Sequence, residues 1–271
     1  MDFRDRVIFI TGASSGIGRE LAVDLAGRGA VVVGCGRSRA RLVEALKEIR
    51  KRSPNSLMIA CDIGDAEQVR AMMQKVLADF GRIDILINNA GIGMRQPFAD
   101  TLLETIEAIM RTNFLGAVYC THEVLPAMIA RGSGHIVNIS SGAGKIGTLN
   151  MAGYCASKFA INGWSESLYH ELKPLGVRVS IVCPGPVTTE FNREFRDSEP
   201  KSPPALFVSA TEVSRRVIQV IETGKFEVVM PRWLALICLA QRLSPTLFRY
   251  LAQRRFRAYV RVPGDSKIEL S

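Results

Sequence analysis

Short apolar runs alternate with longer amphipathic stretches along most of the chain. The seven runs are Val7–Thr11, Ala30–Cys35, Ser56–Cys61, Asp84–Asn88, His135–Ser140, Arg178–Cys183 and Phe226–Met230. Several are almost entirely apolar, as is typical of strands buried on both faces of a parallel sheet. Between the runs, apolar residues recur at helical spacing, and long helical patterns cover about 103–131 and 154–173. The sequence therefore predicts an α/β fold, a doubly wound and mostly parallel seven-stranded sheet with helices on both faces.

Composition places the chain among ordinary globular proteins. It has 271 residues, of which 47% are hydrophobic and 23% charged, so disorder, fibrous repeats and small disulfide scaffolds are excluded. The six cysteines form no CxxC pair and the three histidines are isolated, so we expect core thiols in a reducing compartment and no metal site. The first strand begins close to the N-terminus and no run of about 18 apolar residues occurs. We therefore expect a cytoplasmic protein without a signal peptide or a membrane-spanning helix.

A glycine-rich turn follows the first expected strand. It reads Thr11-Gly12-Ala13-Ser14-Ser15-Gly16-Ile17-Gly18 and leads into a helical pattern. Gly12 permits a tight bend, Gly16 lets the backbone approach a pyrophosphate, and Gly18 permits close helix–strand packing. The helix N-terminus offers free N–H groups to an anion. The strand–turn–helix context favours a dinucleotide site of the Rossmann type, although the spacing is GxxxGxG rather than GxGxxG; a plain turn is the alternative.

The residues after the second expected strand indicate which dinucleotide binds. An NAD site usually carries an acidic residue about 20 positions after its glycines, to bind the ribose 2′-OH. This chain has Gly36-Arg37-Ser38-Arg39 there instead. No carboxylate would repel a 2′-phosphate, and the Arg37 guanidinium can pair with one. NADP(H) is therefore favoured over NAD(H), unless Arg37 only belongs to a solvated helix start.

Two further strand ends carry polar residues. Asp62 follows the third expected strand, where it either accepts a hydrogen bond from an adenine amino group or caps the helix that starts near Asp65. Asn88-Asn89-Ala90-Gly91 ends the fourth strand. Its small residues leave room for a cofactor, and an asparagine there can tie neighbouring strands together; a simple strand-ending turn is the alternative.

A tyrosine and a lysine at helical spacing suggest acid–base chemistry. Tyr154 and Lys158 are four residues apart, so they share one face of the expected helix. A free tyrosine has a pKa of about 10, and a nearby ammonium lowers it. Such a tyrosine can give a proton to a carbonyl oxygen as hydride reaches the carbon. Ser141, at the end of the fifth strand, can face the same crevice and hold the substrate oxygen.

Taken together, these motifs resemble those of the short-chain dehydrogenase/reductase family, in its single-domain branch. The resemblance is carried by TGASSGIG, NNAG, Asn113 within Thr112-Asn113-Phe114, Ser141, YCASK and the run Pro184-Gly185-Pro186-Val187-Thr188-Thr189, in the family's order and near its spacings. It covers about residues 5–231. It implies hydride transfer between a nicotinamide and a carbonyl or secondary alcohol carbon, with a small-molecule substrate.

The resemblance also implies residue roles. Asn113 would hold a water in a proton relay, Ser141 would polarise the carbonyl, and Tyr154 would be the acid/base. Lys158 would lower the tyrosine pKa and bind the nicotinamide ribose. Thr189, rather than its neighbour Thr188, would lie near the carboxamide. The residues expected to bind the cofactor are Gly12, Ser14, Ser15, Gly16, Ile17, Gly18, Arg37, Asp62, Ile63, Asn89, Ala90, Gly91, Tyr154, Lys158, Pro184, Gly185, Val187 and Thr189. Some family members carry a basic residue where this chain has Ser15, so the NADP(H) preference rests mainly on Arg37.

We expect two parts: a Rossmann-fold catalytic domain over 1–231, with a mobile substrate loop at about 190–209, and a C-terminal extension over 232–271. In the loop, Phe191, Phe195, Leu206 and Phe207 would form an apolar lid or simply pack the loop. By resemblance, the long helices at 103–131 and 154–173 would pair subunits into a homodimer or homotetramer.

The extension carries most of the excess positive charge. The formal net charge is +9, and residues 231–262 hold seven arginines and no acidic residue. Because the rest of the chain is near neutral, we expect no nucleic-acid partner. Apolar residues alternate with these arginines, so we expect a helical segment over 232–261. It could lie on an anionic membrane surface, pack on a subunit or cover the active site.

Two functions remain open at this point. The favoured one is an NADP(H)-dependent carbonyl reductase or alcohol dehydrogenase, with a lipophilic substrate if the extension contacts a membrane. The other is a catalytically weak dinucleotide sensor or membrane scaffold on the same fold. The complete set of asparagine, serine, tyrosine and lysine favours the enzyme, because a sensor needs no proton relay.

Overall fold

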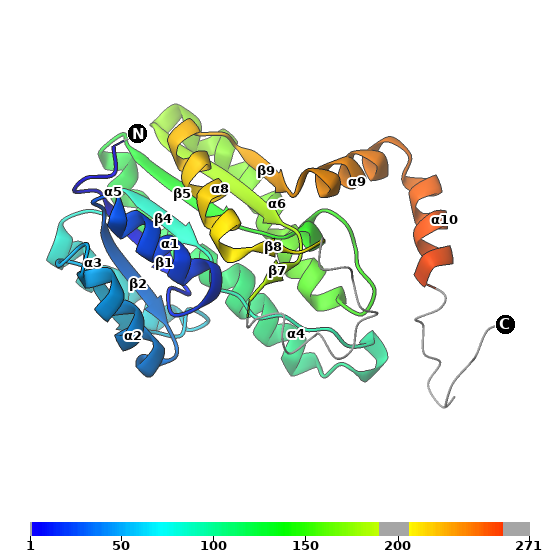
Figure 1. The fold of residues 1–271 in the computed structure, drawn as a ribbon, viewed down its shortest axis with the longest axis horizontal. Coiled ribbons are helices and arrows are strands. Elements are labelled where there is room, and N and C mark those ends of the chain that lie inside the picture. The colour runs from blue at the N-terminus through cyan, green and yellow to red at the C-terminus, as the bar shows by residue number, and fades with distance from the viewer. Residues whose placement is uncertain (1, 190–205, 257–271) are drawn as a thin grey trace.

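A single seven-stranded parallel sheet forms the centre of the molecule (Figure 1). The computed structural model describes residues 2–189 and 206–256. The sheet order is β3-β2-β1-β4-β5-β6-β9, and the strands are β1 (Val7–Thr11), β2 (Val31–Gly36), β3 (Leu57–Ala60), β4 (Ile85–Asn88), β5 (Gly134–Ile139), β6 (Val177–Pro184) and β9 (Glu227–Met230). All seven predicted runs are strands, and no strand end differs from its prediction by more than one residue. The order reverses between β1 and β4, which places a crevice at the carboxyl ends of the central strands.

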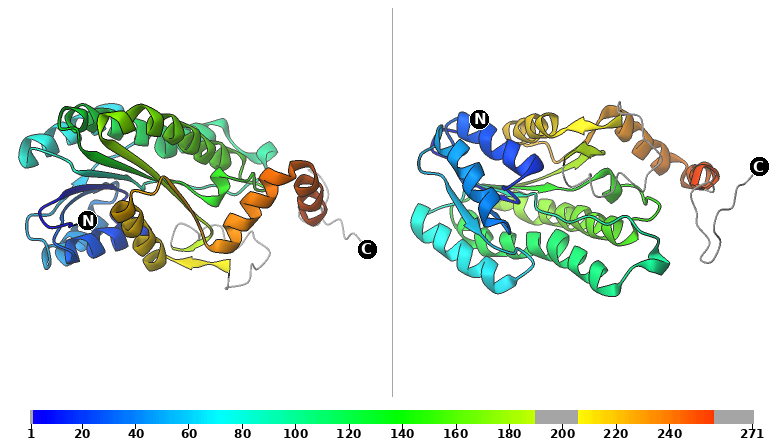
Figure 2. Two further views of the ribbon diagram at one scale, coloured as in Figure 1. Left: turned by 90° about the horizontal axis from the view of Figure 1, so that it is seen from above. Right: turned by 60° about the horizontal axis from the view of Figure 1, so that its bottom comes forward.

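Helices cover both faces of the sheet, as predicted. One face carries α1 (Gly16–Gly27), α2 (Arg39–Arg50) and α8 (Ala210–Thr223), and the other carries α3 (Ala66–Phe80), α5 (Gly116–Ala130) and α6 (Ala152–Leu172) (Figure 2). Alternate residues of one strand enter opposite cores: Ile8 and Ile10 of β1 join the first, and Phe9 joins the second. Because both faces are buried, the strands read as continuous apolar runs.

The helical pattern at 103–131 contains a break that the sequence did not show. The structure has α4 (Leu103–Met110), then a π-helical turn at Arg111–Leu115, then α5. Single π-helical turns inside helices are frequent at functional sites. This one carries Asn113, and the additional residue in the turn changes the direction in which its side chain points.

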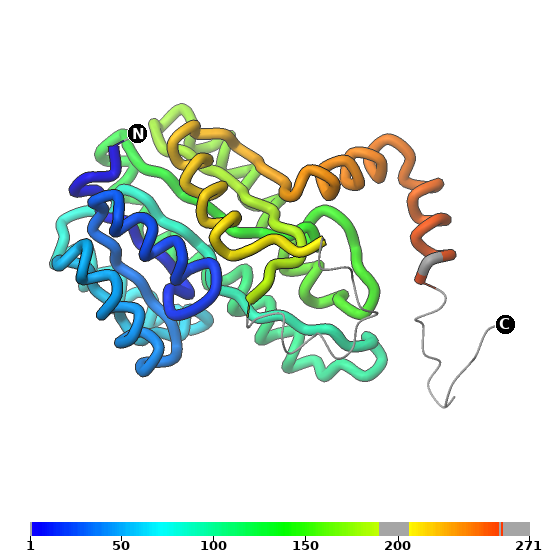
Figure 3. The backbone as a smooth tube through the Cα atoms, viewed as in Figure 1, coloured from blue at the N-terminus to red at the C-terminus, as the bar shows by residue number. Residues whose placement is uncertain are grey.

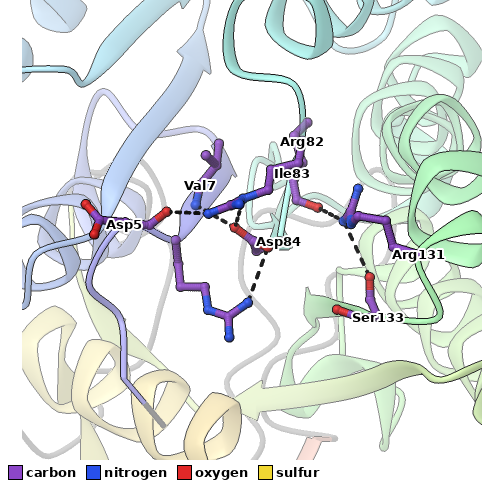
Figure 4. Close-up of polar contacts among 8 residues, drawn as sticks. Asp5, Val7, Arg82, Ile83, Asp84, Arg131 and Ser133 are labelled. Atoms are coloured by element: carbon purple, nitrogen blue, oxygen red, sulfur yellow. Dashed lines mark hydrogen bonds and ion pairs between the residues drawn. The ribbon is translucent and has the colours of Figure 1, made fainter.

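The amino-terminal edge of the sheet is held by charges around one buried carboxylate. Asp84 is 7% exposed and accepts from the Val7 backbone N–H at 2.9 Å, from Arg82 Nε at 3.1 Å and from Arg6 Nη1 at 3.4 Å. Arg131 donates nearby to the Ile83 carbonyl at 2.8 Å (Figure 4). These contacts satisfy a carboxylate that would otherwise be costly to bury, and they lie at the edge opposite to the carboxyl ends of the strands.

Short elements and the chain end complete the fold. Between the longer elements lie η1 (Phe98–Asp100), η3 (Gly142–Gly144) and η4 (Lys173–Leu175), and a two-stranded parallel sheet joins β7 (Val187–Thr188) to β8 (Val208–Ser209). The expected loop at 190–209 therefore ends earlier than predicted, because Val208 pairs with Val187 and Ser209 caps α8. Phe191 and Phe195 lie outside the described residues. The extension forms α9 (Arg232–Leu243) and α10 (Pro245–Phe256), which project from the body of the molecule (Figure 3).

Candidate active site

The glycine turn has the backbone geometry that a phosphate cradle needs. Gly12 and Gly16 have φ values of +69° and +54°, a region that favours glycine. A Cβ at Gly12 would lie 2.9 Å from Ala90 Cα. Ser15 stands at the N-cap of α1 but does not cap the helix with its side chain. The N–H groups of the first turn and the Ser15 hydroxyl are thus the groups that would meet an anion.

Gly18 has the packing role that the sequence predicts. A Cβ at Gly18 would overlap the Gly12 carbonyl and lie 2.6 Å from Asn89 Nδ2. Asn89 itself joins β4 to the turn, because its Nδ2 donates to the Thr11 carbonyl at 3.0 Å and its backbone N–H donates to Thr11 Oγ1 at 2.9 Å. Asn89 therefore ties neighbouring strands together, as its position after β4 suggested. Ile17 packs on the first core.

Asn88 makes the second of these strand ties. Its Nδ2 donates to Asn138 Oδ1 on β5 at 2.8 Å and to Thr121 Oγ1 on α5 at 3.1 Å. Asn138 in turn donates to Ser165 Oγ on α6 at 2.7 Å. This buried polar chain fixes β4, β5 and α6 relative to one another behind the site.

Arg37 and Asp62 meet at one cleft. It has a volume of about 620 Å³ and is lined by Arg37, Asp62, Gly64, Arg111, Thr112 and Tyr119, among others. Ser14 lies beside it, since its Oγ is 3.1 Å from the position of a Cβ at Gly36. The helix cap is Asp65, whose Oδ1 accepts from Glu67 N and Gln68 N. Asp62 Oδ1 instead accepts from Gly64 N at 2.9 Å, so the cap alternative for Asp62 is wrong.

Arg111 is a residue that the sequence interpretation missed. It begins the π-helical turn, is exposed, and lines the same cleft as Arg37. Its Cγ lies 3.3 Å from the position of a Cβ at Gly64, so its aliphatic stem passes over the turn after β3. The residues Arg111-Thr112-Asn113 do not by themselves indicate this position. Ile63, in contrast, points its side chain into the second core against Gly116.

Ser141, Tyr154 and Lys158 come together at the carboxyl end of β5. Ser141 follows that strand, and its Oγ accepts from Ala143 N at 3.1 Å and is hydrogen-bonded to Tyr154. Tyr154 and Lys158 lie on one face of α6, with Lys158 Nζ 5.8 Å from the centroid of the Tyr154 ring. Lys158 Nζ also donates to the Ile139 carbonyl at 3.0 Å, which anchors the ammonium to the end of β5.

Burial sets the protonation states of this pair. Burial raises the pKa of Tyr154 to about 12, against a smaller lowering by the bond to Ser141. Burial lowers the pKa of Lys158 to about 8. The expected lowering of the tyrosine pKa by the ammonium is therefore wrong for this structure, because desolvation of the phenolate dominates. At neutral pH the phenol keeps its proton and is ready to donate it.

Asn113 fastens the π-helical turn to both sides of the site. Its Oδ1 accepts from Ile92 N at 2.7 Å, and its Nδ2 donates to the Ile92 carbonyl at 2.9 Å and to Ser157 Oγ at 3.0 Å. A Cβ at Gly91 would lie 3.2 Å from Asn113 Oδ1 and 3.7 Å from Lys158 Nζ. Asn113, Gly91 and Lys158 thus adjoin one another, and Ser157 is a further site residue that the sequence did not single out.

The segment after β6 closes the site from the other side. Thr189 lies beside the glycine turn, with its methyl group 3.4 Å from the position of a Cβ at Gly16, whereas Thr188 belongs to β7 and is exposed. Thr189, rather than Thr188, is therefore the threonine that lies beside the glycine turn. Val187 is buried in the first core. Pro184 ends β6, and Gly185 N donates to the Met230 carbonyl at 2.6 Å.

One leucine connects the extension to these loops. Leu234 of α9 is 8% exposed, and its Cδ2 lies 2.7 Å from the position of a Cβ at Gly142 and 3.5 Å from that at Gly185. Gly142 follows Ser141, so α9 packs directly on the loop that carries the serine. Lys145 and Glu227 add an ion pair of 2.8 Å between the same loop and β9.

The comparison with known families settles the identity of this arrangement. The family model for the short chain dehydrogenase matches residues 6–200. The chain belongs to the short-chain dehydrogenase/reductase family. The motifs that suggested this dehydrogenase/reductase family in the sequence are those that converge at the carboxyl edge of the sheet.

Relatives with assigned names are similar over most of the chain. The ketoacyl reductase HetN of Nostoc sp. is 36% identical over 226 residues, which cover 83% of this chain and 78% of HetN. The dehydrogenase/reductase SDR family member 7B of Mus musculus is 32% identical, over 93% of this chain and 81% of its own length. An oxidoreductase that acts on a carbonyl or alcohol carbon is thus supported at the level of the family.

Solved structures show the same fold. An actinorhodin polyketide ketoreductase crystallised with NADPH has a TM-score of 0.79 at 31% identity, covering 85% of this chain and 97% of its own. A dehydrogenase/reductase from Burkholderia phymatum in complex with NAD has a TM-score of 0.83 at 24% identity, over 91% and 96% of the two chains. The similar folds thus include both NAD and NADP(H) complexes.

Proposed function

We propose that the protein is an NADP(H)-dependent carbonyl reductase. The observation that carries the proposal is the convergence of Ser141, Tyr154 and Lys158 at the carboxyl end of β5, beside the glycine turn. A protonated tyrosine held by a serine hydroxyl next to a lysine ammonium is the donor set that carbonyl reduction requires. A sensor or scaffold would gain nothing from burying these groups together.

The residues present fit a nicotinamide dinucleotide. Gly12 and Gly16 give the cradle, which a Cβ at Gly12 would fill, and the first turn of α1 offers N–H donors. The remaining expected cofactor residues follow the carboxyl ends of the parallel strands or lie on α6. The side chains of Ile17, Ile63 and Val187 contact the cores, so these three would act through their backbone. When bound, the cofactor supplies the hydride. The protein supplies orientation and the proton.

The protein's own groups carry the proton through the reduction. The substrate oxygen accepts hydrogen bonds from the Tyr154 and Ser141 hydroxyls. As hydride reaches the carbonyl carbon, the Tyr154 O–H bond breaks and its proton moves to that oxygen, giving an alcohol and a phenolate. The Lys158 ammonium, 5.8 Å from the ring centroid, stabilises this phenolate until it regains a proton from solvent. Asn113 would hold the relay water, and its side-chain amide is itself buried and bonded to Ile92 and Ser157.

The preference for NADP(H) rests on Arg37. It lines the cleft next to Asp62, with Ser14 nearby and no acidic residue at the end of β2. Arg111 adds a second guanidinium to this cleft, which is also lined by the carboxylates of Asp62, Asp65, Glu104 and Glu107. The similar structures include complexes with NADPH and NADP and one with NAD, so the proposed preference rests on Arg37.

We further propose a homodimer or homotetramer that pairs the long helices. Phe159 on α6 is 46% exposed and Ile129 on α5 is 37% exposed, so the outward sides of these helices carry apolar residues that a second subunit would cover.

The decisive experiment replaces the proton donor. Tyr154→Phe should lower NADPH-dependent reduction of a ketone panel by at least about a hundredfold, since general acids contribute about 10²–10⁴. NADPH binding, measured by nucleotide fluorescence, should be retained, because the phenol is not part of the phosphate cradle. Tyr250→Phe, on the exposed α10, is the matched control and should keep wild-type rates. Substantial ketone reduction by Tyr154→Phe would contradict the assignment.

A further inference from the structure

The outward sides of α9 and α10 are apolar, although they face solvent. Leu236, Leu239 and Leu243 on α9 and Leu247, Tyr250 and Leu251 on α10 are each at least 52% exposed. Their spacings of three and four residues place them on one stripe of each helix. The half-buried residues Phe248, Ala252 and Phe256 lie on the other side of α10, which packs against α9. The two helices thus expose apolar side chains that take no part in the packing of α9 against α10.

This stripe is bordered by arginines alone. Arg232, Arg242, Arg249 and Arg254 are exposed, and no acidic residue occurs between Glu227 and Asp265. A helix pair with leucines and a tyrosine outward and arginines beside them has the composition of an interfacial membrane segment. No helix among the described residues is long and apolar enough to cross a bilayer, so the pair would lie on the surface.

A second apolar group lies at the same end of the molecule. Phe98, Leu102 and Leu103 are 65%, 69% and 69% exposed at the start of α4. Both views of Figure 2 place this end of α4, α9 and α10 at one end of the molecule, as does Figure 1. The carboxyl end of β9 leads directly into α9, so this is also the end at which the catalytic strands finish.

The charge pattern decides between the two occupants that could cover these residues. A two-fold contact of α9 and α10 with those of a second copy would set the same face against itself, bringing arginine against arginine, because these two helices carry no acidic residue. Anionic lipid headgroups complement the arginines instead, and the leucines reach the acyl boundary. An anionic membrane therefore fits both the charge and the apolar stripe.

We propose that α9 and α10 form a docking surface for an anionic membrane, which holds the end of the molecule that carries the active site at the bilayer. Leu234 fixes the position of this surface relative to the site, because it anchors α9 on the loops of Ser141 and Gly185. The substrate class that follows, a lipophilic ketone or alcohol that partitions into the bilayer, rests on the proposed reductase function.

The test measures co-sedimentation of the full chain with vesicles. Phosphatidylcholine vesicles with an equimolar share of phosphatidylglycerol should bind the protein at least about tenfold more tightly than pure phosphatidylcholine vesicles, with the difference reduced by salt. Leu243→Glu/Leu247→Glu should weaken binding by about tenfold or more. Val43→Glu/Leu175→Glu changes two exposed apolar residues away from this surface and should leave binding unchanged.

A charge-matched pair tests the role of the arginines. Arg242→Gln/Arg249→Gln should weaken binding to the mixed vesicles several-fold, whereas Arg52→Gln/Arg215→Gln removes the same net charge elsewhere and should have little effect. Equal losses in both pairs would show an unspecific charge effect and overturn the docking surface.

Two further readouts separate this inference from the proposed function. All four variants should reduce a water-soluble ketone with NADPH at wild-type rates, because none of them alters the site. Full ketone activity without vesicle binding overturns the docking surface alone, and vesicle binding without any ketone activity overturns the reductase alone. Analytical ultracentrifugation completes the test: an oligomer that Leu243→Glu/Leu247→Glu dissociates, together with no vesicle binding, would assign the face to a second copy.

Discussion

At the scale of single residues, burial is the dominant influence on the catalytic pair. Tyr154 is 7% exposed and Lys158 5%, and each is driven toward its neutral form. For the tyrosine this means a retained proton, and for the lysine a charge that is lost at moderately alkaline pH. The two titrations are well separated, so the lysine alone changes state between about pH 7 and pH 10.

The pH dependence of reduction should therefore follow Lys158. Its pKa, lowered by burial to about 8, means that the ammonium is present below that pH and is lost as the pH rises through it. With NADPH as the varied substrate, kcat/KM reports the free enzyme, and it should fall above about pH 8. Lys158→Arg keeps its charge to higher pH and should move this fall beyond the measured range. A flat wild-type profile to about pH 10 would contradict the role of the lysine charge.

Cofactor choice is a second property of individual side chains. Arg37→Asp should raise the KM for NADPH by about a hundredfold or more, since it exchanges a charge-assisted pair for a repulsion, while the KM for NADH changes little. Arg39→Asp, two residues further along, is the matched control. Steady-state kinetics with both cofactors checks the prediction, and equal effects of Arg37→Asp on both would remove Arg37 from the 2′-phosphate site.

At the scale of elements, what could be predicted depended on whether the information was local. All seven strands were predictable because buried parallel strands are apolar throughout, and Tyr154 and Lys158 were predictable because helical spacing fixes their common face. The π-helical turn at Arg111–Leu115 was not, since it leaves the apolar pattern nearly unchanged. For the same reason Arg111 was missed: its place beside Asp62 and Gly64 arises only when α4 and the turn after β3 come together. The predicted direction of the Tyr154 pKa shift was wrong, because the spacing of two residues does not reveal how deeply they are buried.

Two glycines in helices illustrate how strongly context decides the effect of one methyl group. Gly18→Ala should destabilise the protein by about 1–3 kcal/mol, because the added Cβ overpacks a site already filled by the Gly12 backbone and the Asn89 amide. The same substitution should weaken NADPH binding. Gly163→Ala in α6, where a Cβ meets nothing of its own subunit within 4 Å, should stabilise each subunit by about 0.5–1 kcal/mol. Urea denaturation measures both, and opposite signs are the expected outcome.

At the scale of the whole molecule, the two edges of the sheet are specialised. The amino-terminal edge is held by the charges around Asp84, and the carboxyl edge carries the glycine turn and the catalytic residues. The extension contacts the second edge through Leu234 of α9, which packs on Gly142 and Gly185. We therefore expect α9 to contribute to the stability of the protein and α10 to contribute little to it.

Deletion of 245–271, which removes α10, should change the melting temperature by less than about 2 °C, because the exposed leucines of α10 bury little against the body. Leu234→Ala should cost about 2–3 kcal/mol through the cavity it leaves and lower kcat as the Ser141 loop loosens. Differential scanning calorimetry with ketone kinetics checks both. A larger loss on deleting α10 than on Leu234→Ala would contradict this division.

Gly142 and Gly185 are separated by more than forty positions in the sequence, yet the same leucine rests on both. A side chain at Gly142 would have to turn Leu234 aside, and one at Gly185 would crowd it and Pro231. These three positions can therefore change during evolution only in concert. A homologue in which either glycine is replaced should also carry a smaller residue at position 234, or an extension that follows a different path after β9.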